Sequence, residues 1–253
     1  MLMKSVLKLI LWPFVFWKKS SRVFMRVIVQ AVDMGAPASH LLSEWQYFRS
    51  WRASLRPGAS PVESCLPWLT FRATTYLSAH TNPGYKVFEY GGGGSTLFFL
   101  SRGAYVTTTE HDQGWFELLG KKIGASRFWA GALVLPVLRN PPSACDPSDP
   151  FSFGTSDEQL KDFEFTKYVQ SIRAHPDAEF DIVCVDGRSR PACIALSRAK
   201  VKRGGLLILD NAERDTYARA AKLCTDGFEV VLDAPGSVPS CRWPSQTIIW
   251  KKL

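Results

Sequence analysis

The chain has 253 residues, of which 46% are hydrophobic and 21% charged. This composition argues against a disordered chain and suits one α/β domain with an appendage, or two small domains. The formal net charge of +8 favours acidic partners, but no zinc-finger, RNP or dense basic motif is present, so we expect no nucleic-acid partner. The 6 cysteines include no C-x-x-C pair, which favours reduced thiols and a cytoplasmic protein.

Residues 1–60 are predicted to form an N-terminal helical segment, and residues 61–253 a separate domain. The apolar run from Val6 to Trp17 would be about 18 Å long as a helix, too short for a bilayer core of about 30 Å. Its aromatic and lysine side chains suit a peripheral contact of residues 5–19 with the inner face of the membrane. A helix packed on the domain or on a partner subunit fits equally. A cleaved secretory signal is disfavoured, because lysines follow the run directly and no cleavage motif is near.

Seven short apolar runs within residues 87–250 predict the strands of one sheet. Most of them are separated by room for a helix, which predicts a mostly parallel sheet with helices on both faces. The last two runs are joined by a loop, which predicts an antiparallel last strand. The runs are Val87–Tyr90, Tyr105–Glu110, Ala132–Val137, Asp181–Asp186, Gly205–Asp210, Phe228–Leu232 and Gln246–Trp250.

The segment 138–160 interrupts this rhythm and is rich in Pro, Ser and Asp. Long irregular loops in compact domains are often functional, so we predict a lid over the substrate. A mobile linker is the alternative.

Four glycines, Gly91 to Gly94, lie directly after the first predicted strand and before a predicted helix. Such a turn lets the backbone approach a ligand closely. Glu110 ends the second strand, where a carboxylate can accept hydrogen bonds from both ribose hydroxyls of an adenosine cofactor. Glu89 would be a poor neighbour for a pyrophosphate above the glycines, but it suits a cationic group such as the amino group of an amino-acid cofactor.

The stretch "FEYGGGGST" resembles the E/D-x-G-x-G-x-S/T loop of class I S-adenosylmethionine-dependent methyltransferases. The resemblance covers about residues 65–253 and includes "PWLT", "EHDQGW", "FDIVCVDGRSRPAC" and "RGGLLILDNAERDTY". It implies a Rossmann-like fold and S-adenosylmethionine as the cofactor. Glu89, Gly91 and Gly93 would line the methionine part, Glu110 would hold the ribose, and His111 or Asp112 would lie near the adenine. A residue that caps the next helix is the alternative for His111. The implied cofactor-binding residues are Glu89, Gly91, Gly93, Ser95, Glu110, His111, Asp112 and Asp186.

Asp186 ends the fourth predicted strand, and Asp210 and Asn211 end the fifth, so all three should face one crevice. We predict Asp186 and Asp210 as the catalytic residues. The three residues resemble the magnesium ligands of catechol-type O-methyltransferases, which implies Mg²⁺ at this place. The alternative is that the carboxylates contact cofactor or substrate without a metal. The lysine base of that group is replaced here by Ser189.

Three arginines, Arg188, Arg190 and Arg214, are expected near the same crevice, where guanidinium groups could clamp an anionic substrate. The alternatives are pairing with nearby acids for Arg188 and Arg190, and an exposed helix face for Arg214.

These features predict an S-adenosylmethionine-dependent methyltransferase that acts on a small-molecule or glycan-like acceptor, with oxygen as the expected acceptor atom. An NAD(P)-dependent Rossmann oxidoreductase is the first alternative, although the loop lacks the G-x-G-x-x-G spacing. A catalytically inactive, membrane-associated module with the same fold is the second. The sequence does not indicate an oligomeric state.

Overall fold

A computed structural model of the chain describes residues 19–138, 146, 148–149 and 151–253. The predicted membrane contact of residues 5–19 therefore lies almost wholly outside the described residues, as does part of the predicted lid over 138–160. Within the described part of the chain, no helix combines the length and the hydropathy needed to cross a bilayer.

The N-terminal part is helical, as the sequence predicts. A helix over residues 19–33 is followed by three short helices that together cover residues 40–54. These are α2 (His40–Ser43), the 3-10 helix η1 (Glu44–Tyr47) and α3 (Phe48–Ser54), and a further turn of helix, α4 (Pro61–Ser64), leads into the domain.

The domain is built on one seven-stranded sheet with the order β3-β2-β1-β6-β7-β9-β8. The strand β9 is antiparallel to both of its neighbours, β7 and β8, whereas β3, β2, β1, β6 and β7 pair in parallel. The predicted α/β sheet with an antiparallel last strand is thus confirmed. Its strands are β1 (Lys86–Tyr90), β2 (Tyr105–Glu110), β3 (Trp129–Leu133), β6 (Phe180–Val185), β7 (Val201–Asp210), β8 (Phe228–Gly236) and β9 (Ser245–Lys252).

The third strand is the one whose position the sequence predicts wrongly. It runs over Trp129–Leu133 instead of Ala132–Val137, because Trp129 is the residue that pairs with Val106 of β2. The apolar run that suggested the later position contains Pro136, which has no N–H for the ladder. The residues beyond it form a separate two-stranded sheet of β4 (Val137–Leu138) with β5 (Phe163–Glu164).

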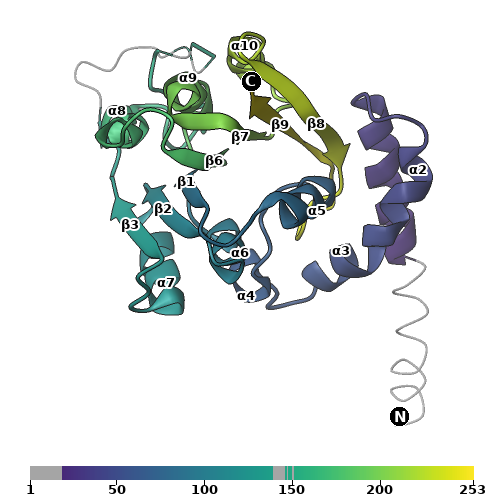
Figure 1. Cartoon of the computed structure of the whole chain (residues 1–253). Coiled ribbons are helices and arrows are strands. Elements are labelled where there is room, and N and C mark those ends of the chain that lie inside the picture. The colour runs from purple at the N-terminus through teal and green to yellow at the C-terminus, as the bar shows by residue number, and fades with distance from the viewer. Residues whose placement is uncertain (1–18, 139–145, 147, 150) are drawn as a thin grey trace.

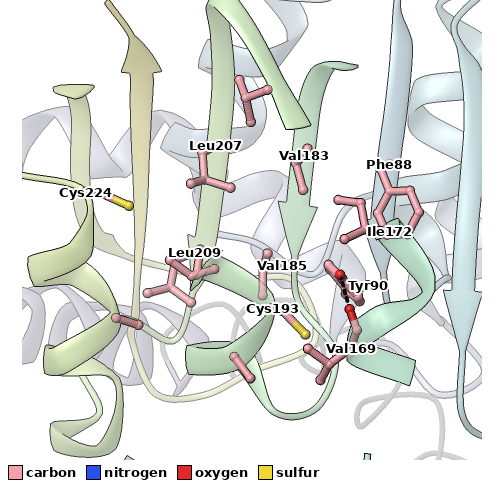
Figure 2. Packing of buried hydrophobic residues seen from close by; sticks show 14 of the residues in the cluster. Phe88, Tyr90, Val169, Ile172, Val183, Val185, Cys193, Leu207, Leu209 and Cys224 are labelled. Atoms are coloured by element: carbon pink, nitrogen blue, oxygen red, sulfur yellow. Dashed lines mark hydrogen bonds between the residues drawn. The ribbon is translucent and has the colours of Figure 1, made fainter. Parts of the chain in front are cut away.

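Helices cover both faces of the seven-stranded sheet, as Figure 1 shows, with α8, α9 and α10 on one face and α5, α6 and α7 on the other. The helices are α5 (Phe71–His80), α6 (Gly94–Ser101), α7 (Gln113–Ile123), α8 (Thr166–Gln170), α9 (Arg190–Lys200) and α10 (Ala218–Leu223), with short 3-10 turns η2 (Ser171–Ala174) and η3 (Asp215–Tyr217). Each face has its own hydrophobic core. In the first core the buried Tyr90 hydroxyl donates to the Val169 carbonyl at 2.6 Å, which ties β1 to α8 (Figure 2).

A third cluster packs the N-terminal helices against the domain beside β8 (Figure 1). Phe24 and Ile28 from the helix over 19–33 lie against Phe48 and Trp51 of α3 and Phe71 of α5, and all five are buried. The Trp51 indole also donates its Nε1–H to the Cys241 carbonyl at 2.6 Å. The N-terminal segment is therefore bound to the domain by core packing, whereas the predicted boundary at residues 60–61 stays a prediction.

Because Trp51 is fully buried and hydrogen-bonded, we expect Trp51→Ala to lower the free energy of unfolding by about 3–5 kcal/mol. Trp51→Phe should lose about 1–3 kcal/mol, because the ring is retained but the Cys241 carbonyl loses its donor. Leu42→Ala, at a side chain that is 83% exposed, should change stability by less than about 0.5 kcal/mol. Denaturant unfolding measures all three, and equal stability of the Trp51→Ala and Leu42→Ala proteins would contradict the described packing.

Candidate active site

A cavity of about 550 Å³ opens at the carboxyl ends of the parallel strands. This is the edge of an open α/β sheet where ligands bind. Among the residues predicted from the sequence, it is lined by Gly91, Gly93, Ser95, Glu110, His111, Asp112, Asp186, Arg188, Arg190, Asp210, Asn211 and Arg214. The fold therefore brings every predicted site residue except Glu89 to one cavity.

Backbone atoms of other chain segments lie close to the glycine loop. Gly91 has φ +90°, and a Cβ there would lie 2.9 Å from the Gly187 Cα. A Cβ on Gly94 would overlap the carbonyl oxygen of Leu66. Glycine is thus required at both ends of the loop by packing against neighbouring chain segments, in addition to any approach of a ligand.

Three successive N–H groups of the glycine loop are already used inside the protein. Gly91 N–H donates to the Thr109 carbonyl at 2.9 Å, and Gly92 N–H to Glu110 Oε2 at 2.8 Å. Gly93 N–H donates to Thr96 Oγ1 at 3.0 Å. A dinucleotide site needs such N–H groups for the pyrophosphate. In this loop the first three N–H groups are not free for a pyrophosphate, because they donate within the protein.

Glu110 is nearly buried and is held by the start of the next loop. Its Oε1 accepts the N–H groups of His111 and Asp112 at 2.7 and 2.9 Å, and His111 Nδ1 lies 2.8 Å from the same oxygen. Burial alone would raise the pKa of Glu110, but these contacts outweigh it and lower the pKa below the ordinary value. Because Oε2 accepts only Gly92 N–H among the described residues, it keeps capacity for a ligand hydroxyl.

The helix-capping role considered for His111 belongs to Asp112. Asp112 is the N-cap of α7, and its Oδ1 accepts the Trp115 N–H at 2.7 Å. His111 Nε2 instead accepts Arg188 Nε–H at 3.3 Å. His111 and Asp112 both line the cavity, beside Trp115, whose indole donates to the Gly92 carbonyl.

Glu89 is not among the residues that line the cavity, so its expected contact with a methionine moiety stays a prediction. Its side chain is fully buried, with Oε2 accepting the Thr108 hydroxyl at 3.2 Å. Oε1 accepts no hydrogen bond from any residue that the structure describes. Burial raises the pKa of Glu89 to about 7, although neighbouring hydroxyl groups offset part of the effect.

Arg190 joins the ends of β6 and β7, and its side chain is only 7% exposed. Nε donates to the Gly187 carbonyl, Nη1 to the Asp210 carbonyl and Nη2 to the Asp186 carbonyl, at 3.0, 2.5 and 2.9 Å. Nη2 also lies 3.0 Å from Asp186 Oδ1, and Nη1 3.5 Å from Asp210 Oδ2. Three N–H donors of the guanidinium thus bind backbone carbonyls, and its charge is paired with both carboxylates. Arg190 therefore pairs with the nearby acids, the alternative considered from the sequence, and the binding of a substrate anion by it stays a prediction.

Asp186, Asp210 and Asn211 lie together as predicted, but they do not fit a magnesium site. The Arg190 guanidinium places a positive charge between the two carboxylates, where a divalent cation would have to lie. Asn211 donates its Nδ2–H to Ser245 Oγ at 2.7 Å. Across the described ranges, no group of three or more His, Cys, Asp and Glu residues is arranged to hold a metal ion. The predicted Mg²⁺ is therefore not supported.

Burial raises the pKa of both aspartates above the ordinary range, and the positive charge of Arg190 offsets only part of this effect. The two differ in accessibility. The Asp186 side chain is 18% exposed, whereas Asp210 is 4% exposed and its Oδ1 accepts the Thr247 hydroxyl at 2.7 Å. Asp186 is thus the carboxylate that a ligand in the cavity can reach.

Arg188 connects the cavity to the described part of the predicted lid. Its Nη2 lies 2.9 Å from Asp157 Oδ2, and the adjacent Ser189 hydroxyl donates to the Gly154 carbonyl at 2.5 Å. Arg214 also lines the cavity and is exposed, and it forms no ion pair with any of the described residues. The lid and the binding of an anion by these arginines stay predictions.

Sequence reasoning missed the aromatic wall of the cavity. Trp68 and Trp243 are 49% and 65% exposed, and they line it together with Val238, Cys241 and Ser245. Trp68 lies in the "PWLT" stretch before α5, to which no site role was assigned, whereas Val238, Cys241 and Trp243 lie in the loop between β8 and β9, and Ser245 begins β9. A tryptophan in a Pro- and Ser-rich loop was the one available signal.

No protein-family model and no curated protein matches this chain in sequence. Among solved structures, it is similar to the O-methyltransferase from Bacillus cereus in complex with SAH, at 15% identity and a TM-score of 0.52, over 92% of this chain and 99% of that one. Fibrillarin from Aeropyrum pernix with bound S-adenosyl-L-methionine (12% identity, TM-score 0.43, 67% of each chain) and TrmN from Thermus thermophilus (14%, 0.44, 72% and 48%) also match. Since these two TM-scores are below 0.5, the comparison of folds rests on the Bacillus enzyme.

The chain has the class I methyltransferase fold. The prediction made from the glycine loop and the order of the strands is therefore confirmed at the level of fold.

The burial of Glu89 should make stability depend on pH. Its folded-state pKa of about 7 exceeds the ordinary 4.5, so between these values the unfolded chain loses a proton that the folded protein keeps. Stability should therefore fall as pH rises through this interval, by about 3 kcal/mol in total. Glu89→Gln, which cannot ionise, should be more stable than the native protein by up to this amount near pH 8, and the gain should shrink near pH 4.

Denaturant unfolding at the two pH values measures the gain. Glu158→Gln, at a side chain that is 87% exposed, is the matched control and should leave the pH dependence unchanged. An identical pH dependence for Glu89→Gln and native protein would show that the carboxyl is not buried as described.

Proposed function

We propose that the protein is an S-adenosylmethionine-dependent methyltransferase that methylates an oxygen atom of its acceptor. The observation that carries the cofactor choice is the glycine loop, whose first three N–H groups donate within the protein and are not free for the pyrophosphate of NAD(P). The Glu110 carboxylate beside the loop suits the ribose hydroxyls of an adenosine cofactor. The class I fold supports the same choice.

The cavity fits the cofactor by the chemistry of its groups. Glu110 Oε2 has room for a ribose hydroxyl, and His111, Asp112 and Trp115 surround that end of the cavity. Gly93 and Ser95 line the wall where the methionine part would lie. The Glu89 carboxyl beneath the loop, with its pKa of about 7, would be drawn into its ionised form by a cationic ligand above it.

When bound, the cofactor supplies a methyl group on a positively charged sulfur, which keeps the electron pair of the broken bond and leaves S-adenosylhomocysteine. The acceptor side needs only a group that takes the hydroxyl proton. Asp186 is the reachable carboxylate in the middle of the cavity, and we assign it this role. Arg190 and Asp210 hold Asp186 in place and do not contact the acceptor.

The cofactor assignment is tested by calorimetric titration of the full chain with S-adenosylhomocysteine and, separately, with NADH. We expect micromolar binding of the first and none of the second. Glu110→Ala should weaken S-adenosylhomocysteine at least about tenfold, since it removes a charged acceptor for the ribose. Thermal unfolding identifies any loss of fold in that variant. Binding of NADH alone would overturn the assignment in favour of an oxidoreductase.

The base assignment is tested by Asp186→Asn, which keeps the size of the side chain and removes its basicity. We expect transfer to fall by about 10²–10⁴-fold, while S-adenosylhomocysteine affinity changes only a few-fold. Because the pKa of Asp186 is raised, the fraction of ionised Asp186 still increases with pH above the range in which an ordinary aspartate titrates. In this pH range kcat/KM of the native enzyme should therefore rise. A profile that is already flat near pH 5 would refute Asp186 as the base, and cofactor binding without transfer to any acceptor would favour the inactive binding module.

A further inference from the structure

The cavity has two chemically different ends. The strand order places β1 and β2 on one side of the β6–β7 pair and β9 and β8 on the other. The glycine loop and Glu110 therefore lie at one end, and Asp186 and Asp210 lie in the middle. The far end is formed by Trp68, Arg214 and the loop that carries Val238, Cys241 and Trp243. If the first end holds the cofactor, the far end is left for the acceptor.

Two indole rings dominate the far end. Trp68 is 49% exposed and Trp243 is 65% exposed, and both line the same cavity. Large exposed aromatic surface next to a cavity favours binding, because rings stack on one another and lose little conformational freedom. Trp68 is also fixed in orientation, since its Nε1–H points to Cys241 Sγ at 3.3 Å.

The loop behind these rings is anchored by the N-terminal helices. Trp51 Nε1 donates to the Cys241 carbonyl, and Ser240 N–H donates to Ser54 Oγ at 2.7 Å. The buried Glu44 carboxylate accepts the Ser237 hydroxyl at 2.7 Å and forms an ion pair with Arg72. These contacts make the far end a preorganised surface, which lowers the entropic cost of holding a ligand.

Arg214 brings a positive charge to the far end, while the neighbouring Glu213 does not line the cavity and accepts the Ser245 hydroxyl at 3.2 Å. Arg214 is exposed, stacks over the Tyr217 ring with its Cζ 5.6 Å from the centroid, and forms no ion pair with the described residues. The side chains that line this end in the described chain include Asn211 and Ser245 but no carboxylate. In the middle, the charges of Asp186 and Asp210 are already shared with Arg190.

From this juxtaposition we infer that the acceptor is a hydroxylated ring compound that carries an anionic group. Its ring lies against the indoles of Trp68 and Trp243, and its carboxylate or phosphate binds Arg214. A ring hydroxyl then lies toward Asp186. This inference rests on the proposed methyltransferase function and adds the chemical class of the acceptor. Acidic sugars and hydroxylated aromatic acids share this chemistry.

The test pairs an acidic with a neutral ring compound of each kind, glucuronate with glucose and salicylate with phenol. Their binding to the S-adenosylhomocysteine-loaded full chain is measured by calorimetry, and methyl transfer is measured with S-adenosylmethionine. We expect at least one acidic member to be preferred over its neutral partner by about tenfold or more. The pair that shows the preference tells whether the ring is a sugar or aromatic.

Variants connect the preference to the named residues. Arg214→Met should abolish the preference for the acidic member, and Trp243→Ala should weaken both members of the pair by about tenfold. Arg242→Met is the matched control, because Arg242 is exposed on the same loop as Trp243 but does not line the cavity. It should leave the preference unchanged, and S-adenosylhomocysteine affinity should be unchanged in all three variants.

Equal binding of acidic and neutral members, an unchanged preference in Arg214→Met, or no binding of any member by cofactor-loaded protein would each overturn the inference. In all these outcomes S-adenosylhomocysteine still binds, so the proposed function would survive. Loss of S-adenosylhomocysteine binding by the native protein is the separate result that refutes the function itself.

Discussion

The ion pairing of Arg190 with Asp186 and Asp210 is the interaction on which the centre of the site depends. Parallel strands bring the partly exposed Asp186 and the buried Asp210 to adjacent ends of β6 and β7, where the two carboxylates would repel each other. Arg190 lies on the first turn of α9 and returns between them, bonding to the backbone carbonyls of both strand ends. The Arg190 side chain thereby holds the two strand ends together, and its guanidinium group supplies the positive charge between the two carboxylates.

The two sides of the cavity differ in their side chains. On one side, the glycine loop gives its N–H groups to the protein and leaves a carboxylate facing the cavity, which suits a positively charged cofactor. On the other side, indole rings and Arg214 face the cavity without any carboxylate among the described lining residues. The middle holds Asp186 with a raised pKa.

The N-terminal helices support one end of the cavity. Glu44, Trp51 and Ser54 are more than 180 residues away from the 237–241 loop in sequence, yet each forms a hydrogen bond to this loop at the aromatic end of the cavity. The resemblance that predicted the fold begins near residue 65 and gave no reason to expect this. Substitutions in α3 should therefore be tested for effects on ligand binding at the end of the cavity with Trp68 and Trp243, as well as on stability.

The sequence by itself determined the mostly parallel seven-stranded α/β sheet, the reversed β9 and the set of residues that meet at the strand ends. These follow from local signals: apolar runs, a glycine turn and acids at the ends of strands. It placed β3 three residues late, because an edge strand with few buried residues has a weak pattern. Only the tertiary structure decided that Glu89 does not line the cavity, that Arg190 pairs with both Asp186 and Asp210, and that two tryptophans and Arg214 line the same cavity. Those outcomes depend on which distant side chains compete for the same space and the same hydrogen-bond donors, and no local pattern encodes that competition.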